Sequence, residues 1–162
     1  VLNARFRNDQ RGRYPLFGHI SEALHEYLQS FVLDQNTFAM FCKRCDTYAS
    51  LTVRHRSIVL APKLLFVMIN RCGGAANLVK IQHPIKYDVA GWCIEEGEKK
   101  IAYDLSAAIN HSGSLKAGHY IAKVRSVCDA SQWFYTSDST VYPISADSVV
   151  SGDSMVLIYE RQ

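Results

Sequence analysis

Two short segments near the C-terminal end of the sequence carry side chains suited to acid–base catalysis. His119 follows a glycine, and Ser137 and Asp138 end an aromatic run further along the chain. A histidine acts as a general base when a partner on its second ring nitrogen fixes one tautomer. Neighbouring antiparallel strands bring such partners within reach of each other. The two segments therefore predict a base and its orienting group on adjacent strands.

The orienting group is either Ser137 or Asp138. Consecutive strand residues face opposite ways, so only one of the two can address His119 unless the strand has a bulge. A serine hydroxyl accepts the imidazole N–H but brings no negative charge to an imidazolium. The residues alone leave both Ser137 and Asp138 open as the orienting group. The non-catalytic alternatives are a histidine at a sheet edge and a turn that ends the strand at these residues.

Small residues lie on the N-terminal side of His119. Gly113 and Gly118 enclose a loop of such residues, and a glycine lets another backbone approach closely. Both are therefore candidate substrate-binding positions at a narrow cleft. Tyr120 is predicted to point to the face opposite His119, where it would pack or contact a ligand at the sheet edge.

The elements that must position these residues are mostly strands. Ser21 can cap a helix whose apolar stripe consists of Leu24, Tyr27, Leu28 and Phe31. β-branched and aromatic residues predominate later in the chain. The predicted strands are approximately Val1–Phe6, Ser50–Arg54, Ser57–Leu60, Leu64–Asn70, Ile81–Tyr87, Lys100–His111, His119–Val127, Gln132–Ser137 and Ser154–Glu160. One helix followed by an antiparallel sheet, without linker or repeat, is the predicted organisation.

The segment around His119 resembles the histidine box of the ubiquitin-specific proteases, papain-like cysteine hydrolases that cut after the C-terminal glycine of ubiquitin. Four other segments resemble this family in the right order: a helix at Ile20–Leu28, half a zinc ribbon at Phe41–Cys45, a strand at Ala61–Arg71 and the closing strand at Met155–Arg161. The resemblance implies a β-predominant α+β fold, an antiparallel palm sheet plus part of the zinc-ribbon fingers. It identifies residues 1–162 as the C-terminal part of such a catalytic domain.

The resemblance assigns a role to each candidate residue. It makes His119 the general base and aligns Ser137 with the orienting position, where the family generally has an acid and some members have serine. Asp138 would then hold a water or act near the oxyanion. No cysteine resembles the family's nucleophile segment, since Cys72, Cys93 and Cys128 are isolated. The thiolate is therefore expected in an upstream segment, and this chain alone is expected to be inactive.

Cys42 and Cys45 have the two-residue gap that lets a tight turn present two thiolates to zinc. Structural zinc takes four ligands, and the resemblance places the other pair upstream. We therefore expect at most half of a structural zinc site in this chain. The alternative is a reduced pair of thiols at the tip of a hairpin.

Composition excludes several classes of protein. A chain of 162 residues with 48% hydrophobic and 20% charged residues suits one folded domain that buries roughly 70% of its surface. Its apolar runs are far shorter than the roughly 20 residues of a membrane span. A net charge of +3 gives no reason to expect nucleic acid. Five irregularly spaced cysteines favour a reducing compartment, the cytoplasm or nucleus.

The intact protein is thus predicted to be a deubiquitinating cysteine hydrolase whose partners are ubiquitin or ubiquitinated proteins and the missing N-terminal half of the domain. The first alternative is an inactive module of the same fold that binds ubiquitin or acts as a scaffold. The absence of charge at Ser137 favours it. The second alternative is a zinc-ribbon interaction domain unrelated to ubiquitin, built on Cys42 and Cys45.

Overall fold

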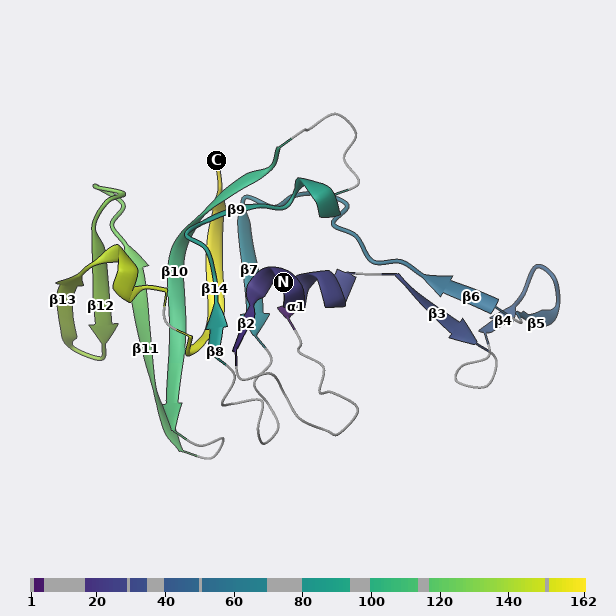
Figure 1. Ribbon diagram of the computed structural model, residues 1–162, viewed down its shortest axis with the longest axis horizontal. Helices are drawn as coiled ribbons and strands as arrows, with labels where there is room; N and C mark the ends of the chain where they lie inside the picture. The colour runs from purple at the N-terminus through teal and green to yellow at the C-terminus, as the bar shows by residue number, and fades with distance from the viewer. Residues whose placement is uncertain are drawn as a thin grey trace.

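The structure is a computed structural model that describes residues 2–4, 17–28, 30–34, 40–49, 51–69, 80–93, 100–113, 117–150 and 152–162 (Figure 1). Cys72 and residues 1, 5 and 6 of the predicted strand Val1–Phe6 lie outside these residues. In the described part of the chain, no helix is both long and apolar enough to cross a membrane.

The largest element is an eight-stranded sheet, in which β10 and β14 lie at the centre. Its strands in spatial order are β1 (Leu2–Ala4), β7 (Leu64–Ile69), β14 (Ser154–Arg161), β10 (Ala102–Gly113), β11 (Gly118–Arg125), β12 (Trp133–Ser137) and β13 (Thr140–Ile144), and β9 (Lys86–Asp88) also pairs with β10. Its pairs are antiparallel except β1 with β7. The strand-rich α+β fold agrees with the prediction, whereas the wholly antiparallel arrangement does not. The short strands β2 (Phe17–His19) and β8 (Lys80–Gln82) are also parallel.

Two short antiparallel ribbons extend from one side of this sheet (Figure 1). The inner ribbon pairs β3 (Phe31–Asp34) with β6 (Leu51–Arg54), and the outer one pairs β4 (Met40–Cys42) with β5 (Thr47–Ala49). The aromatic rings of Phe41 and Tyr48 pack edge to face across the outer ribbon, with centroids 5.2 Å apart. We call these two ribbons the fingers.

The helix α1 (Ile20–Leu28) packs an apolar stripe onto the core. Its buried members are Ile20, Ala23, Leu24 and Leu28, and burial of each isoleucine or leucine side chain contributes about 1.5–3 kcal/mol. The predicted stripe ran on to Phe31, but the helix ends at Leu28 and Phe31 begins β3. Periodicity alone does not locate the point at which a helix gives way to a strand.

His19, rather than the predicted Ser21, caps this helix. Its ring Nδ1 accepts a hydrogen bond from the backbone N–H of Ser21 at 3.1 Å. The backbone N–H of His19 donates to the Glu22 carboxylate at 3.2 Å. This is the reciprocal arrangement of a capping box, with imidazole in the place of a hydroxyl. The cap therefore lies two residues earlier than the residue types suggested.

The strand β7 shows how the sheet divides its two faces. Leu65, Val67 and Ile69 are buried, while the alternate residues Leu64, Phe66 and Met68 are 38–47% exposed. The buried face joins the α1 stripe and the side chains of β10 and β14 in one core. Period-two alternation along a strand accounts for this division.

The predicted strands differ from the structure at several places, and β2, β3, β4 and β5 have no predicted counterpart. Residues 57–60 form only an isolated bridge, from Ile58 to Cys93. The predicted strand Ile81–Tyr87 is divided into β8 and β9, and Pro84, which cannot donate to a ladder, lies between them. The prediction also missed β13, an edge strand that contains Pro143, a position where a missing N–H is tolerated.

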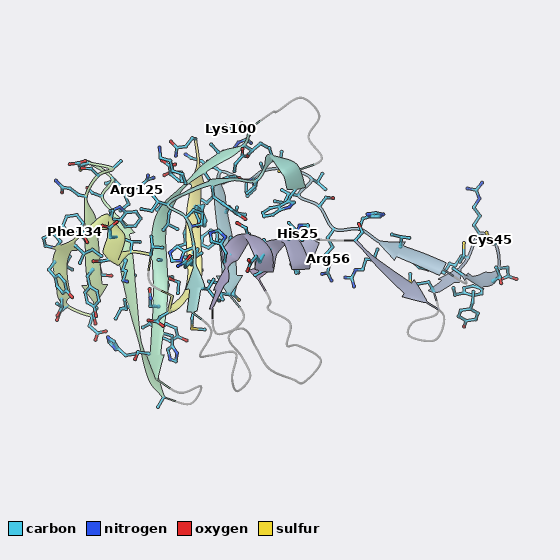
Figure 2. The ribbon with its side chains drawn as sticks, viewed as in Figure 1. His25, Cys45, Arg56, Lys100, Arg125 and Phe134 are labelled. Carbon is cyan, nitrogen blue, oxygen red and sulfur yellow. The ribbon has the colours of Figure 1, made fainter. Side chains whose placement is uncertain are left out.

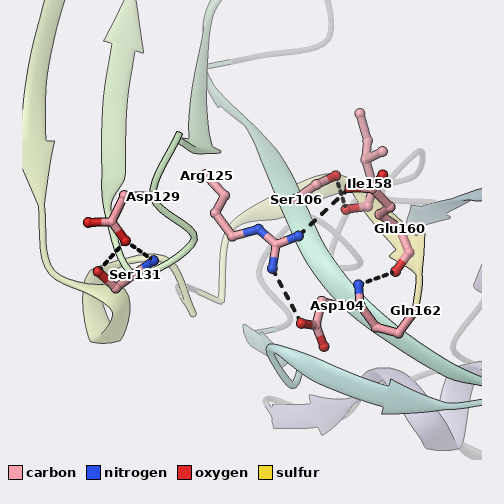
Figure 3. A network of polar contacts seen from close by, with 8 residues as sticks. All are labelled: Asp104, Ser106, Arg125, Asp129, Ser131, Ile158, Glu160 and Gln162. Atoms are coloured by element: carbon pink, nitrogen blue, oxygen red, sulfur yellow. Dashed lines mark hydrogen bonds and ion pairs between the residues drawn. The ribbon is translucent and has the colours of Figure 1, made fainter. Parts of the chain in front are cut away.

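A half-buried ionic network ties the central strands together (Figure 3). The Arg125 guanidinium on β11 lies 3.4 Å from the Asp104 carboxylate on β10 and 3.8 Å from the Glu160 carboxylate on β14. The side chains of Arg125 and Asp104 are only 13% and 18% exposed, so solvent screens this pair less than a surface pair. The network fixes three neighbouring strands near the end of β11 that is remote from His119.

Candidate active site

His119 is the second residue of β11, close to where the hairpin of β10 and β11 begins its ladder. The register pairs it with Ser112, one step inside the terminal pair of Gly113 and Gly118. Its side chain is 51% exposed. An imidazole on a strand end with this exposure has a fixed backbone and an open edge, as a proton-transfer group requires.

Ser137 lies beside His119, as the sequence pattern predicted. It is the last residue of β12, the strand that pairs with β11. Its Oγ is 2.6 Å from His119 Nε2. If the imidazole donates from Nε2, the hydroxyl oxygen accepts, and Nδ1 keeps its lone pair for a proton. The hairpin strands thus fix the ring in an orientation suitable for a base.

Asp138 also approaches the histidine, and the strand-alternation argument did not foresee this. Its Oδ2 lies 4.0 Å from His119 Nε2. Asp138 is in the turn between β12 and β13 and has a left-handed φ of 49°, so alternation along β12 does not govern its direction. Its side chain is 84% exposed, and solvent therefore screens its charge strongly.

Gly118 and Gly113 are both exposed, but each has protein atoms close to where a Cβ would project. A Cβ on Gly118 would lie 2.0 Å from His111 Nε2, and one on Gly113 would lie 2.6 Å from the carbonyl oxygen of Ala117. Gly113 also has a φ of 124°, which side chains rarely adopt. Tyr120 pairs with His111 on the face opposite His119 and is 61% exposed.

His111 is a residue to which the sequence pattern assigned no role. Its imidazole lies against Gly118 and packs on Tyr120, with ring centroids 4.5 Å apart. The signal that could have found it is its position two residues before Gly113, which places it opposite Tyr120 once the hairpin register is known. That register depends on the loop, which composition does not specify.

Cys42 ends β4, and Cys45 lies in the turn that follows, at the tip of the fingers and far from the eight-stranded sheet (Figure 2). Backbone N–H groups of Cys45 and Arg44 point at the Cys42 sulfur and lower the pKa of that thiol. A stabilised thiolate at such a turn suits a soft metal such as zinc. Among the described residues, no group of three or more histidine, cysteine or acidic side chains is placed to hold a metal. The donors present fit half a zinc site.

The other described cysteines lie away from the candidate base. Cys128 follows β11 at the end opposite His119. Cys93 follows the short helix η2 (Ala90–Trp92), and its backbone forms an isolated β-bridge with Ile58. The described contacts of the His119 ring are with Ser137 and Asp138.

A second serine–histidine contact lies at the base of the fingers. Ser30 Oγ and His55 Nδ1 form a short hydrogen bond, and both residues are exposed. The neighbouring Arg56 donates to the Tyr27 carbonyl at 3.0 Å and lies over the Tyr27 ring. In this pair the Ser30 hydroxyl contacts Nδ1 of His55, so Nε2 is the ring nitrogen that the serine does not engage.

His83 represents a third environment, inside the core. It follows β8, and its side chain is 1% exposed. Burial lowers its pKa from 6.5 to about 4, and the charges of Lys123 and His19 act in the same direction. This histidine is therefore neutral near pH 7.

The strand-rich fold places a half-exposed imidazole beside a serine hydroxyl, an arrangement in which a histidine can serve as a base. The family model described as ubiquitin carboxyl-terminal hydrolase matches residues 20–159. The chain belongs to this family, as the resemblance indicated.

Relatives and solved structures agree with this assignment. Ubiquitin carboxyl-terminal hydrolase 17 of Arabidopsis thaliana is 27% identical over 89% of this chain, and ubiquitin carboxyl-terminal hydrolase 16 of Danio rerio is 31% identical over 50% of it. The SAGA DUB module Ubp8/Sgf11/Sus1/Sgf73 bound to monoubiquitin matches 90% of the chain with a TM-score of 0.74 and 23% identity. The chain spans 20% and 13% of the two relatives and 35% of that solved chain.

Proposed function

We propose that the protein containing this chain is a cysteine-dependent deubiquitinase and that this chain supplies its general base. The observation that carries the proposal is the 2.6 Å contact between Ser137 Oγ and His119 Nε2, which leaves Nδ1 at an exposed ring for a thiol. Two further facts support it. The family match covers most of the chain, and the structural neighbours include complexes with ubiquitin.

The chemistry follows from the orientation of the ring. A cysteine thiol from outside the described residues gives its proton to His119 Nδ1, and the thiolate attacks the carbonyl carbon of the last glycine of ubiquitin. The imidazolium then returns the proton to the leaving amine. His119 next deprotonates a water that cleaves the thioester. Ser137 holds the ring in position throughout, and Asp138 adds a screened negative charge beside the imidazolium.

Gly113, Gly118 and Tyr120 belong to the same proposed site. The terminal pair of the hairpin ladder and the exposed Tyr120 lie directly beside His119. An extended ubiquitin tail that reaches His119 must therefore pass along this end of the hairpin. We assign Gly113 and Gly118 to the wall of that passage, and Tyr120, which faces the other side of the hairpin, to a contact at its edge.

We also propose that Cys42 and Cys45 supply two of the four ligands of a structural zinc ion in the intact protein. The lowered pKa of the Cys42 thiol and the two-residue spacing support this assignment. Zinc would fix the tip of the fingers and take no part in proton transfer. Metal analysis of the purified protein, with Cys45→Ser as the comparison, tests it: equal zinc content in both would reject it.

An inactive ubiquitin-binding module is the second candidate function. The observation in its favour is Ser137, a neutral group where a carboxylate would stabilise the imidazolium better. The Asp138 carboxylate at 4.0 Å weighs against it, since it returns negative charge to the same nitrogen.

One experiment separates the two functions. The intact protein is treated with ubiquitin that carries a C-terminal electrophile, and ubiquitin binding is measured in parallel. We expect covalent labelling in the parent protein, loss of labelling in His119→Ala, and unchanged labelling in His25→Ala, an exposed histidine on α1. Binding of ubiquitin without any labelling would establish the module and reject the enzyme.

A further inference from the structure

The imidazole of His111 fills the space beside the backbone of Gly118. A Cβ built on Gly118 would lie 2.0 Å from His111 Nε2 and 2.6 Å from Cε1. These separations are well inside van der Waals contact, so the ring occupies the place where a side chain would be. His111 therefore presses directly on the residue that precedes His119.

The same ring also contacts the residue that follows His119. The His111 and Tyr120 rings have centroids 4.5 Å apart and an interplanar angle of 40°, within the range of favourable aromatic packing. Both are paired across β10 and β11 in the hairpin register. One half-buried side chain thus contacts both chain neighbours of the candidate base.

His111 acts from the opposite face of the hairpin. His119 pairs with Ser112, so alternation places its ring on the other side from His111 and Tyr120. His111 therefore affects His119 through the backbone at residues 118–120 and does not reach the reacting atoms.

The location makes this packing consequential. His119 lies one pair from the end of the ladder, and its described side-chain contacts are those with Ser137 and Asp138. The direction of its Cα–Cβ bond depends on how firmly the backbone on either side is held. Misplacement of a reacting group by about 1 Å can cost on the order of 100-fold in rate.

We propose that His111 is a positioning residue, which clamps the backbone around His119 and so keeps the His119 ring within reach of Ser137. The inference deepens the proposed function, since the consequence for turnover rests on His119 being the base. The geometric part stands by itself and has its own measurement.

The experiment uses the full-length protein with His111→Ala, His111→Phe and the control His25→Ala. With a ubiquitin substrate that releases a fluorophore, we expect His111→Ala to lower kcat roughly 10- to 100-fold with little change in KM. His111→Phe keeps an aromatic ring against Tyr120 and should restore most of the rate. Parent-like kcat in His111→Ala, or a rise in KM alone, would overturn the inference.

A second readout does not depend on hydrolysis. Nuclear magnetic resonance of histidine-labelled protein reports which ring nitrogen of His119 carries the proton. We expect one tautomer in the parent and in His111→Phe, and a mixture in His111→Ala. Unchanged His119 signals in His111→Ala reject the positioning role. Changed signals in a protein that never turns over ubiquitin support the role and reject the proposed function instead.

His111→Gln provides a variant of similar polarity if His111→Ala does not fold. It lacks the ring and should resemble His111→Ala in both readouts. Parent-like kcat and His119 signals in a folded His111→Gln protein would reject the role of the ring.

Discussion

Two exposed serine–histidine pairs in the described part of the chain, one at the hairpin of the large sheet and one at the base of the fingers, are chemically alike but differ in their surroundings. In the first, Ser137 contacts Nε2 of His119, and a carboxylate lies 4.0 Å from the same nitrogen. In the second, Ser30 contacts Nδ1 of His55, and the neighbouring cation, Arg56, is bound to the Tyr27 carbonyl.

The difference shows that a hydroxyl–imidazole contact alone does not define a catalytic site. Either hydroxyl can fix one ring nitrogen, and the His119 pair has in addition a negative group placed to stabilise a protonated ring. His119 also lies within the ladder of β10 and β11, where it pairs with Ser112, whereas Ser30 and His55 lie just beyond the last pair of the ladder of β3 and β6. Support from neighbouring elements, rather than the contact itself, distinguishes the two.

The largest expected effect is the loss of the base. His119→Ala should lower kcat of the intact protein on a ubiquitin substrate by on the order of 10²- to 10⁴-fold, the usual contribution of a positioned acid–base group. His55→Ala, the matched change in the other pair, should leave kcat unchanged. Steady-state kinetics of both variants measures this, and equal losses in the two would remove the distinction between the pairs.

The buried histidine extends the comparison to stability. The pKa of His83 is about 4 in the folded protein and 6.5 when exposed, so the unfolded chain takes up a proton first as the pH falls. Stability from this group is fully present above pH 6.5 and is lost between pH 6.5 and about 4, at a cost of about 3 kcal/mol.

Urea unfolding at a series of pH values, compared with His83→Leu, measures that cost. The variant should lose less stability than the parent between pH 6.5 and 4, because it has no imidazole to protonate at this position. Identical pH dependence in the two proteins would show that His83 is not the group responsible.

Removal of the orienting hydroxyl should have a smaller effect. Ser137→Ala deletes one hydrogen bond worth about 1 kcal/mol, which corresponds to about a fivefold lower kcat. Ser30→Ala deletes the corresponding bond at the fingers and should leave kcat unchanged. The same kinetic assay compares the two variants. An unchanged kcat in Ser137→Ala would show that a group other than Ser137 orients His119.

Asp138 should have the smallest effect. Asp138→Asn keeps a residue that tolerates the left-handed turn and removes only a strongly exposed charge. We expect at most about a threefold fall in kcat at low salt, and less at high salt because counterions screen the charge. A large loss that salt does not change would show that Asp138, and not Ser137, is the main partner of His119.

Much of the site could be predicted because its determinants are local. A histidine after a glycine and a hydroxyl at the end of the next strand can meet between neighbouring strands when the register puts both side chains on one face. Asp138 could not be placed in this way, because its direction depends on a left-handed turn. His111 also escaped prediction, since its importance arises only when the register sets it against Gly118.

The fold was predictable in outline for the same reason. Alternation identified most strands of the large sheet, while the parallel pairing of β1 with β7 joins segments too distant in sequence for local patterns to show. The prediction was wrong at both ends of the helix. Its cap is an imidazole outside the usual set of capping residues, and its last predicted position, Phe31, was claimed by a strand.

The proline on the outermost strand of the large sheet has a consequence for association with other chains. β13 ends the strand order beyond β12, and a free edge of this kind can recruit foreign strands. Pro143 has no N–H to offer an incoming backbone, so a guest strand laid along that edge would lack a bond in the middle of its ladder. Replacement of Pro143 by a residue with a backbone N–H would complete that ladder and favour edge-to-edge association. Pro143 therefore disfavours aggregation through this edge.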